Sequence, residues 1–124
     1  KTFLLSEYGA KKTNMTRAVN QGGAYEIQKG VTSYNNMIKN VKKGILLCRF
    51  SGGYPAQNGD FSGVAKNSYY IEDGEIKQPI NETMISGNLE KLFLNIKDIS
   101  SETIDFGDSI LPWISFTDVT VSGK

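Results

Sequence analysis

The chain has 124 residues, a net charge of +1, 39% hydrophobic residues and 22% charged residues, which indicates one soluble globular domain long enough to bury a core. No apolar run approaches the roughly 20 residues of a membrane helix, and the near-neutral charge argues against a nucleic-acid partner. The chain has no histidine and a single cysteine, Cys48, which excludes a histidine-based triad, an internal disulfide and a histidine-ligated metal site within this chain.

The chain begins at Lys1 without the pattern of a signal peptide, and we expect it to be a fragment of a longer protein. Residues 1–12 have helical spacing of Phe3, Leu4 and Tyr8, with lysines toward the end, and predict a helix. Residues 24–28 predict a short strand.

The next segment predicts an amphipathic helix followed by a strand. Apolar residues recur at helical spacing from Tyr34 to Val41, the hydroxyl pair Thr32-Ser33 suits the N-cap, and Gly44 suits the position after the helix. Residues 45–50 form a continuous apolar run, which predicts a strand buried on both faces and makes Cys48 a small buried residue.

Glycines then gather in residues 52–63, where the backbone must adopt positive φ or pass close to bulky groups. A strand-like run follows and ends at Asp73-Gly74. An Asp-Gly pair between β-forming residues favours a type I′ turn, so this segment predicts a hairpin.

The last third predicts short strands around a second helix. Pro79 is expected to break the hairpin ladder, and residues 82–86 predict a strand. The segment Ser86-Gly87-Asn88 is expected to cap a helix whose apolar stripe faces the core. That stripe consists of Leu89, Leu92, Phe93 and Ile96.

Residues 99–103 predict a connector or weak strand. Pro112 reduces residues 110–114 to an edge strand or a strand start, and residues 116–121 predict the last strand. The elements together indicate a mainly β (α+β) fold, an antiparallel β barrel or sandwich with two to three short helices packed on it.

The residues alone leave two interpretations of the glycine-rich segment open. Its backbone N–H groups could bind an anion, or a strand edge flanked by glycine could accept an extended peptide by strand addition. No pair of carboxylates has a spacing that compels acid–base catalysis.

Four motifs in order resemble a known family. They are Asn58 to Tyr69, the hairpin from Ile71 to Ile76, Thr83 to Leu89, and the closing Leu111-Pro112-Trp113 with Val121 to Lys124. Together they resemble the C-terminal domain of the TldD/PmbA family, proposed modulators of DNA gyrase that are now regarded as zinc metallopeptidases.

The resemblance implies a cytoplasmic, metal-dependent peptidase complex that acts on unfolded peptides or peptide precursors. It implies a dimer with a TldD-like or an identical subunit and a peptide substrate, while the charge and composition predict no nucleic-acid partner and no membrane partner. In TldD-type members a His-Glu-x-x-x-His helix lies upstream and a cysteine near the C-terminus completes the zinc site. Residues 103–112 contain no cysteine here, so the chain resembles the PmbA/TldE-type subunit, which lacks the metal ligands.

We therefore expect a scaffold and assembly domain, inactive as a fragment, with no catalytic residue, metal ligand or cofactor of its own and with zinc in the parent complex. One alternative is a domain of an active zinc metallopeptidase whose metal helix lies upstream; another is a non-enzymatic module that interacts with DNA gyrase. The predicted chamber or interface residues are Ser51, Gly52, Gly53, Asn58, Gly59, Asp60, Phe61, Ser62 and Gly63.

Overall fold

The computed structural model describes Lys12 and residues 25–123 and divides the chain into two compact units. The smaller unit comprises Lys1–Ile27 and Ile104–Leu111, and the larger unit comprises Gln28–Thr103 and Pro112–Lys124. The helix predicted for residues 1–12 falls outside the described residues except at Lys12, which is helical.

The described part of the smaller unit is built around a parallel strand pair. β1 (Tyr25–Glu26) pairs with the start of β9 (Ser109–Phe116), with Tyr25 opposite Ser109. β8 (Ile96–Asp105) enters this unit at its C-terminal end, and Gly107, at φ +90°, turns the chain back into β9. The predicted strand at 24–28 is thus present in shorter form.

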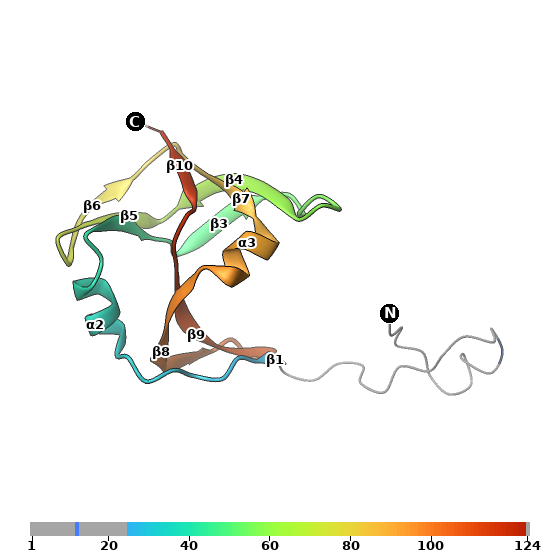
Figure 1. The fold of residues 1–124 in the computed structure, drawn as a ribbon, viewed down its shortest axis with the longest axis horizontal. Coiled ribbons are helices and arrows are strands. Elements are labelled where there is room, and N and C mark those ends of the chain that lie inside the picture. The colour runs from blue at the N-terminus through green and yellow to red at the C-terminus, as the bar shows by residue number, and fades with distance from the viewer. Residues whose placement is uncertain (1–11, 13–24, 124) are drawn as a thin grey trace. The chain divides into compact units, whose positions relative to one another are not determined.

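The larger unit is organised around one long, bent hairpin (Figure 1). Its first arm consists of β2 (Lys43–Leu46) and β3 (Arg49–Gly52), and its second arm of β4 (Asp60–Lys66) and β5 (Ser68–Glu72). Leu46 faces Tyr69 and Arg49 faces Lys66, so the pairing register is the same on both sides of the bend. The two halves of the hairpin nevertheless belong to different sheets.

The single buried strand predicted for residues 45–50 is therefore wrong, because the arm is interrupted at Leu47 and Cys48. Cys48 is exposed and not a buried core residue. The bend is closed by Ser68, which is fully buried: its hydroxyl accepts a hydrogen bond from the Cys48 N–H at 3.1 Å and donates to the Lys66 carbonyl at 2.8 Å. Hydrophobic periodicity cannot reveal such a side-chain bridge.

The Asp73-Gly74 turn is confirmed as the connection between β5 and β6 (Glu75–Ile80). Both residues have positive φ, 48° and 78°, as a type I′ turn requires. Pro79 does not end the strand: β6 is an edge strand, where a missing N–H is tolerated, and the ladder contains a register shift instead.

Helix α2 (Tyr34–Lys39) is capped as expected, because the Ser33 hydroxyl accepts a hydrogen bond from the Asn36 N–H at 3.3 Å. Asn40 forms the C-cap and Gly44 lies in β2, so the predicted role of Gly44 is wrong. The β5–β6 turn sits on the end of this helix, with the Gly74 N–H donating to the Val41 carbonyl at 2.8 Å.

A four-stranded sheet with the order β10-β7-β4-β3 contains β7 (Thr83–Asn88) and β10 (Thr120–Ser122). Helix α3 (Leu89–Leu94) follows β7 directly, and its predicted N-cap is confirmed: the Asn88 side chain accepts from the N–H groups of Glu90 and Lys91. The predicted core-facing stripe is only partly right: Leu89 and Leu92 are half-buried, but Phe93 is 61% exposed and Ile96 lies in β8 and is 37% exposed. No residue of α3 is fully buried, and Leu94, outside the predicted stripe, is 79% exposed.

The remaining strands are longer than expected. The weak strand predicted at 99–103 is the middle of the ten-residue β8, and the last predicted strand is divided, with Phe116 ending β9 and Asp118 turning the chain at φ 59°. Pro112 is buried inside β9, two residues beyond the pairing with β1, where β9 has lost that neighbour.

The described residues form three sheets in which almost all of the registered pairs are antiparallel, so the mainly β fold is confirmed and its sandwich-like form fits better than a closed barrel. Few apolar side chains are buried in the described part: Met37, Ala65, Ile71, Ile85 and Pro112. Neither described helix has the length and apolar character needed to cross a bilayer.

Candidate functional site

The nine predicted site residues come together at the end of the β3–β4 hairpin (Figure 1). Ser51 and Gly52 end β3, Gly53 begins the connecting loop, Asn58 and Gly59 end that loop, and residues 60–63 open β4. In Figure 1 this loop extends away from the other elements of the larger unit. The nine residues therefore lie in one continuous region of the structure. We call this region, residues 50–63, the hairpin end.

The glycines of the hairpin end make room for two aromatic rings. Phe50 and Phe61 pack edge to face with ring centroids 6.1 Å apart. A Cβ on Gly63 would lie 2.5 Å from the Phe50 ring, and one on the paired Gly52 would lie 2.6 Å from it. Across the sheet, a Cβ on Gly87 would lie 3.0 Å from the Phe61 ring. These positions therefore stay glycine because the rings lie across the backbone.

An amide–carboxylate network ties the loop to the start of α3. The Asn88 side-chain amide donates to the Asn58 carbonyl and to Asp60 Oδ1, both at 2.9 Å, and the Asn58 amide donates to Asp60 Oδ2 at 2.7 Å. The Leu89 N–H donates to the Gly59 carbonyl at 2.9 Å. Asn88 thus caps α3 with its oxygen and holds the loop with its nitrogen.

This network sets the charge state of Asp60. The hydrogen bonds from Asn88 and Asn58 lower the pKa of the Asp60 carboxyl below its ordinary value, and the nearby Lys91 adds to the effect. Both carboxylate oxygens are occupied by amide donors. Asp60 therefore acts as an anchor of the loop and is poorly placed to serve as a general base.

The loop between β3 and β4 also carries a residue that is not among the predicted site residues. Tyr54 is fully exposed, at 101% of its reference accessibility, and a Cβ on the preceding Gly53 would meet nothing within 4 Å. From Phe50 to Gly59 no residue is charged. That uncharged run between Arg49 and Asp60 is visible in the sequence and could have drawn attention to Tyr54.

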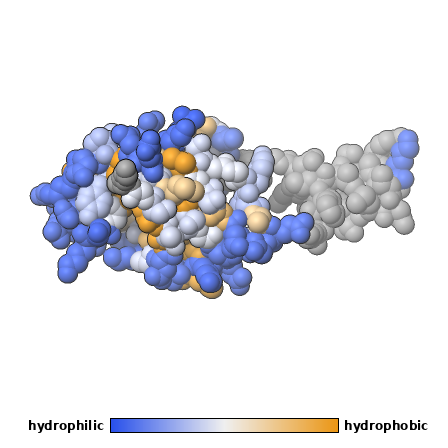
Figure 2. All heavy atoms as spheres, turned by 90° about the horizontal axis from the view of Figure 1, so that it is seen from above, coloured by the Kyte–Doolittle hydropathy of each residue, from blue (hydrophilic) through white to orange (hydrophobic). Residues whose placement is uncertain are grey.

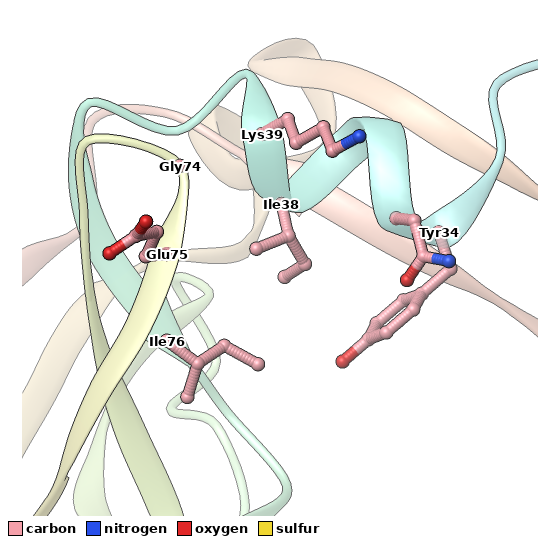
Figure 3. Close-up of a pocket in the computed structure, with 7 residues that line it drawn as sticks. Tyr34, Ile38, Lys39, Gly74, Glu75 and Ile76 are labelled. Carbon is pink, nitrogen blue, oxygen red and sulfur yellow. The ribbon is translucent and has the colours of Figure 1, made fainter.

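A second region of interest is a shallow groove of about 460 Å³ between α2 and the β5–β6 turn. Figure 3 shows the side chains of Ile38 and Ile76 and the ring of Tyr34 directed into it, while the carboxylate of Glu75 points away. Glu75 is paired with Lys77. Burial raises the pKa of the Tyr34 hydroxyl, and nearby Cys48 adds to the rise. The groove is the space between α2 and the β5–β6 turn where these two elements pack against each other.

The zinc implied by the family resemblance does not fit the residues that the structure describes. Among them, no three side chains of the His, Cys, Asp and Glu types lie close enough together to hold a metal ion. Cys48 is exposed at the hairpin bend, where Ser68 binds its backbone N–H. Thiolate and carboxylate ligands are thus not gathered anywhere in residues 25–123.

Comparison with known proteins gives consistent matches. A "Metalloprotease PmbA homolog" of Buchnera aphidicola subsp. Acyrthosiphon pisum is 32% identical over 126 residues, covering 99% of this chain and 28% of the relative. A solved structure of a proposed modulator of DNA gyrase from Bacteroides thetaiotaomicron has a TM-score of 0.82 at 27% identity, with 99% of this chain and 28% of that chain covered.

The solved structure of TldE from Thermococcus kodakarensis has a TM-score of 0.75 at 26% identity, with 98% of this chain and 31% of that chain covered. The chain thus spans less than a third of the length of these proteins. The model of the PmbA/TldA metallopeptidase C-terminal domain matches residues 1–123. With nearly every residue matched, the chain belongs to this family of metallopeptidase C-terminal domains.

Proposed function

We propose that the chain is the scaffold and assembly domain of a PmbA/TldE-like subunit in a metal-dependent peptidase complex, and that it supplies no metal ligand. The complex would act on unfolded peptides or peptide precursors in the cytoplasm, with zinc held elsewhere in the complex. The partner is a TldD-like or an identical subunit. The observation that carries this proposal is the amount of apolar surface that the domain leaves uncovered.

That surface lies on secondary structure elements as well as on loops. Phe93 and Leu94 of α3 are mostly exposed, and Met84 and Val121 of the four-stranded sheet are about half exposed. Figure 2 shows hydrophobic and neutral residues gathered over the centre of the face viewed, with hydrophilic residues around them. Large apolar side chains that stay exposed on a helix and on a sheet are suited to being covered by another protein surface.

The metal-free half of the proposal has separate support. Among the described residues no cluster of metal-binding side chains exists, and residues 103–112 contain no cysteine. The role then left to this domain is to position other parts of the complex. Its exposed helix would pack either on the rest of its own subunit or on the partner subunit.

Truncating α3 in the full-length protein tests the assembly role. We expect the double variant Phe93→Ala/Leu94→Ala to weaken association with the partner subunit by about tenfold or more, because the interface would lose two apolar side chains that it buries. Glu90→Ala, an exposed polar truncation on the same helix, is the matched control. Analytical ultracentrifugation of the subunits measures the association.

Metal analysis of the same preparations tests the second half. Zinc bound stoichiometrically by the full-length protein without a TldD-like subunit would contradict the metal-free assignment and favour the active zinc peptidase. Association that Phe93→Ala/Leu94→Ala leaves unchanged, with the apolar face still protected from solvent in the monomer, would assign the face to contacts within the subunit and overturn the assembly role.

A further inference from the structure

The loop between β3 and β4 contains the one Asn-Gly pair of the chain, Asn58-Gly59. Asparagine is thermolabile because the backbone nitrogen of the following residue can attack its side-chain amide carbon. A following glycine has no side chain that would hinder this attack. Gly59 has a φ of +87°, which other residues rarely adopt, so the turn itself keeps a glycine next to Asn58.

The reaction open to this pair is deamidation in two steps. A bond forms between the Gly59 nitrogen and Asn58 Cγ while the bond from Cγ to Nδ2 breaks, and the Gly59 amide proton leaves with Nδ2 as ammonia. Water then opens the cyclic imide at one of its two carbonyl carbons, which gives aspartate or isoaspartate at position 58. Asn58 is exposed, so water reaches the reacting atoms.

In the folded loop all four polar atoms of the reacting unit are hydrogen-bonded. The Gly59 N–H donates to the Ala56 carbonyl at 2.8 Å. The Asn58 carbonyl, in the same peptide group, accepts from the Asn88 side-chain amide at 2.9 Å. The Asn58 side-chain oxygen accepts from the Asp60 N–H at 3.1 Å, and its nitrogen donates to Asp60 Oδ2 at 2.7 Å. Ring closure removes the Gly59 proton and rotates the Asn58 amide, so it has to break these hydrogen bonds first.

Asn88 holds this arrangement from outside the loop. Its side-chain amide also donates to Asp60 Oδ1 at 2.9 Å, and the neighbouring Leu89 N–H donates to the Gly59 carbonyl at 2.9 Å. The pKa of the Asp60 carboxyl is lowered by these side-chain amides, so the carboxylate stays ionised and keeps accepting from them at neutral pH. Hydrogen bonds to a charged acceptor are stronger than neutral ones, which makes Asn88 the main external support of the loop.

We propose that Asn58 is a site of spontaneous deamidation, which this hydrogen-bond network suppresses and which reacts when the loop detaches from Asn88. The product cannot rebuild the network. An aspartate at position 58 places a carboxylate where the amide donated to Asp60, so two like charges meet. An isoaspartate lengthens the backbone by one carbon before Gly59 and displaces the Gly59 carbonyl from the Leu89 N–H. Deamidation therefore makes the detachment of the loop permanent, whether or not the domain has the proposed assembly role.

The rate of deamidation at position 58 tests this inference. Full-length protein is incubated at constant neutral pH, and the products at position 58 are followed by mass spectrometry of proteolytic peptides. We expect the folded protein to react slowly and the same protein unfolded in urea to react faster. Asn88→Ala should raise the rate in the folded protein by about 5- to 30-fold, because a larger fraction of the loop is open.

Two further variants separate release of the loop from fraying of α3. Asn88→Asp keeps a side-chain oxygen as the N-cap of α3 but removes the amide donor, so it should also accelerate the reaction. Asn95→Ala, the same truncation at the other end of α3, is the matched control and should react like the unmodified protein. Asn67, which is exposed and precedes Ser68 at the hairpin bend, serves as an internal reference whose rate should stay constant.

Several results would overturn the inference. If Asn58 does not deamidate in urea, it is not a reactive site. If the folded and the unfolded protein react equally fast, or if both Asn88 variants react like the unmodified protein, the network does not suppress the reaction. An equal acceleration at Asn58 and Asn67 would assign the effect of the variants to unfolding of the whole domain instead of release of the loop.

Discussion

The Ser68 side chain bridges the two arms of the long hairpin at its bend. A buried serine in a strand is usually a packing residue, but here its hydroxyl satisfies a backbone donor of one arm and a backbone acceptor of the other at the bend of the hairpin. A buried backbone group without a hydrogen-bond partner destabilises the folded state. By supplying these two partners, the Ser68 hydroxyl allows the hairpin to bend and its two halves to belong to different sheets while the pairing register stays the same.

Replacing Ser68 with alanine should open this bend. The Cys48 N–H and the Lys66 carbonyl would each lose a partner, at a cost of about 1–3 kcal/mol. We expect faster hydrogen exchange at the Cys48 amide, measured by mass spectrometry on the full-length protein. Ser122→Ala, at an exposed position of β10, is the control. Unchanged exchange at Cys48 would show that water replaces the hydroxyl without loss.

Asp60 gives the hairpin end a defined pH dependence. Its folded-state pKa is lowered, so the stabilisation it provides is fully present above the unfolded-state value near 4 and is lost as the pH falls through the lower folded-state value. The Asn88 side-chain amide should then lose its carboxylate acceptor. In NMR spectra with labelled asparagine, the Asn88 amide signals should shift in acid, whereas Asn36 serves as a distant reference.

The Asp60→Ala variant separates this titration from general acid unfolding. In that variant the Asn88 signals should start at shifted positions at neutral pH and change little on acidification. If they titrate as in the unmodified protein, another carboxylate is responsible for the effect.

Among the secondary structure elements, the sequence correctly predicted the turns and helix caps that depend on interactions between neighbouring residues. The Asp73-Gly74 turn and the caps at Ser33 and Asn88 depend on backbone conformation and neighbouring N–H groups, so their residue types suffice. The exposed stripe of α3 and the divided strand around Cys48 depend on what lies across the sheet or outside the domain. Apolar periodicity predicts which face of a helix or strand is apolar, but it does not identify the surface that covers this face.

The glycines of the hairpin end show the same limit. The sequence indicated that Gly52 and Gly63 were structurally constrained, and we expected them to line the peptide chamber or an interface. The structure adds the physical cause, the Phe50 ring lying across both. That cause could not be read from the sequence, because the pairing of Gly52 with Gly63 depends on the conformation of the loop between β3 and β4.

Substitutions at two neighbouring glycines should therefore differ sharply. Gly63→Val places a branched side chain against the Phe50 ring and the Ser51 carbonyl, which a Cβ would approach to 2.5 and 2.7 Å. We expect a loss of about 1–3 kcal/mol or more in stability. Gly53→Ala, facing open space, should change little. Thermal denaturation of the full-length proteins compares them.

A compensating change makes this test more specific. Adding Phe50→Ala to Gly63→Val should recover only part of the loss, because the clash with the Ser51 carbonyl remains. Full recovery would mean that the ring alone requires the glycine, and no recovery would mean that the backbone contact dominates.

At the scale of the whole molecule, the described part of the chain has a small buried core and much uncovered apolar surface. Its stability in the natural protein should then depend on the surfaces that cover it more than on a bound metal. Metal ions stabilise a fold where their ligands lie, and no metal-binding group of side chains occurs in residues 25–123.

Removal of metal from the assembled complex should accordingly leave this domain intact. After chelation we expect unchanged hydrogen-exchange protection at the amides of Gly74 and Leu89, which donate to Val41 and Gly59 within the domain. Separation of the subunits, in contrast, should increase exchange in α3, because the surface that protects it is lost. If chelation exposes α3 while the subunits stay associated, a metal stabilises this domain directly. The proposal that zinc is held elsewhere in the complex is then wrong.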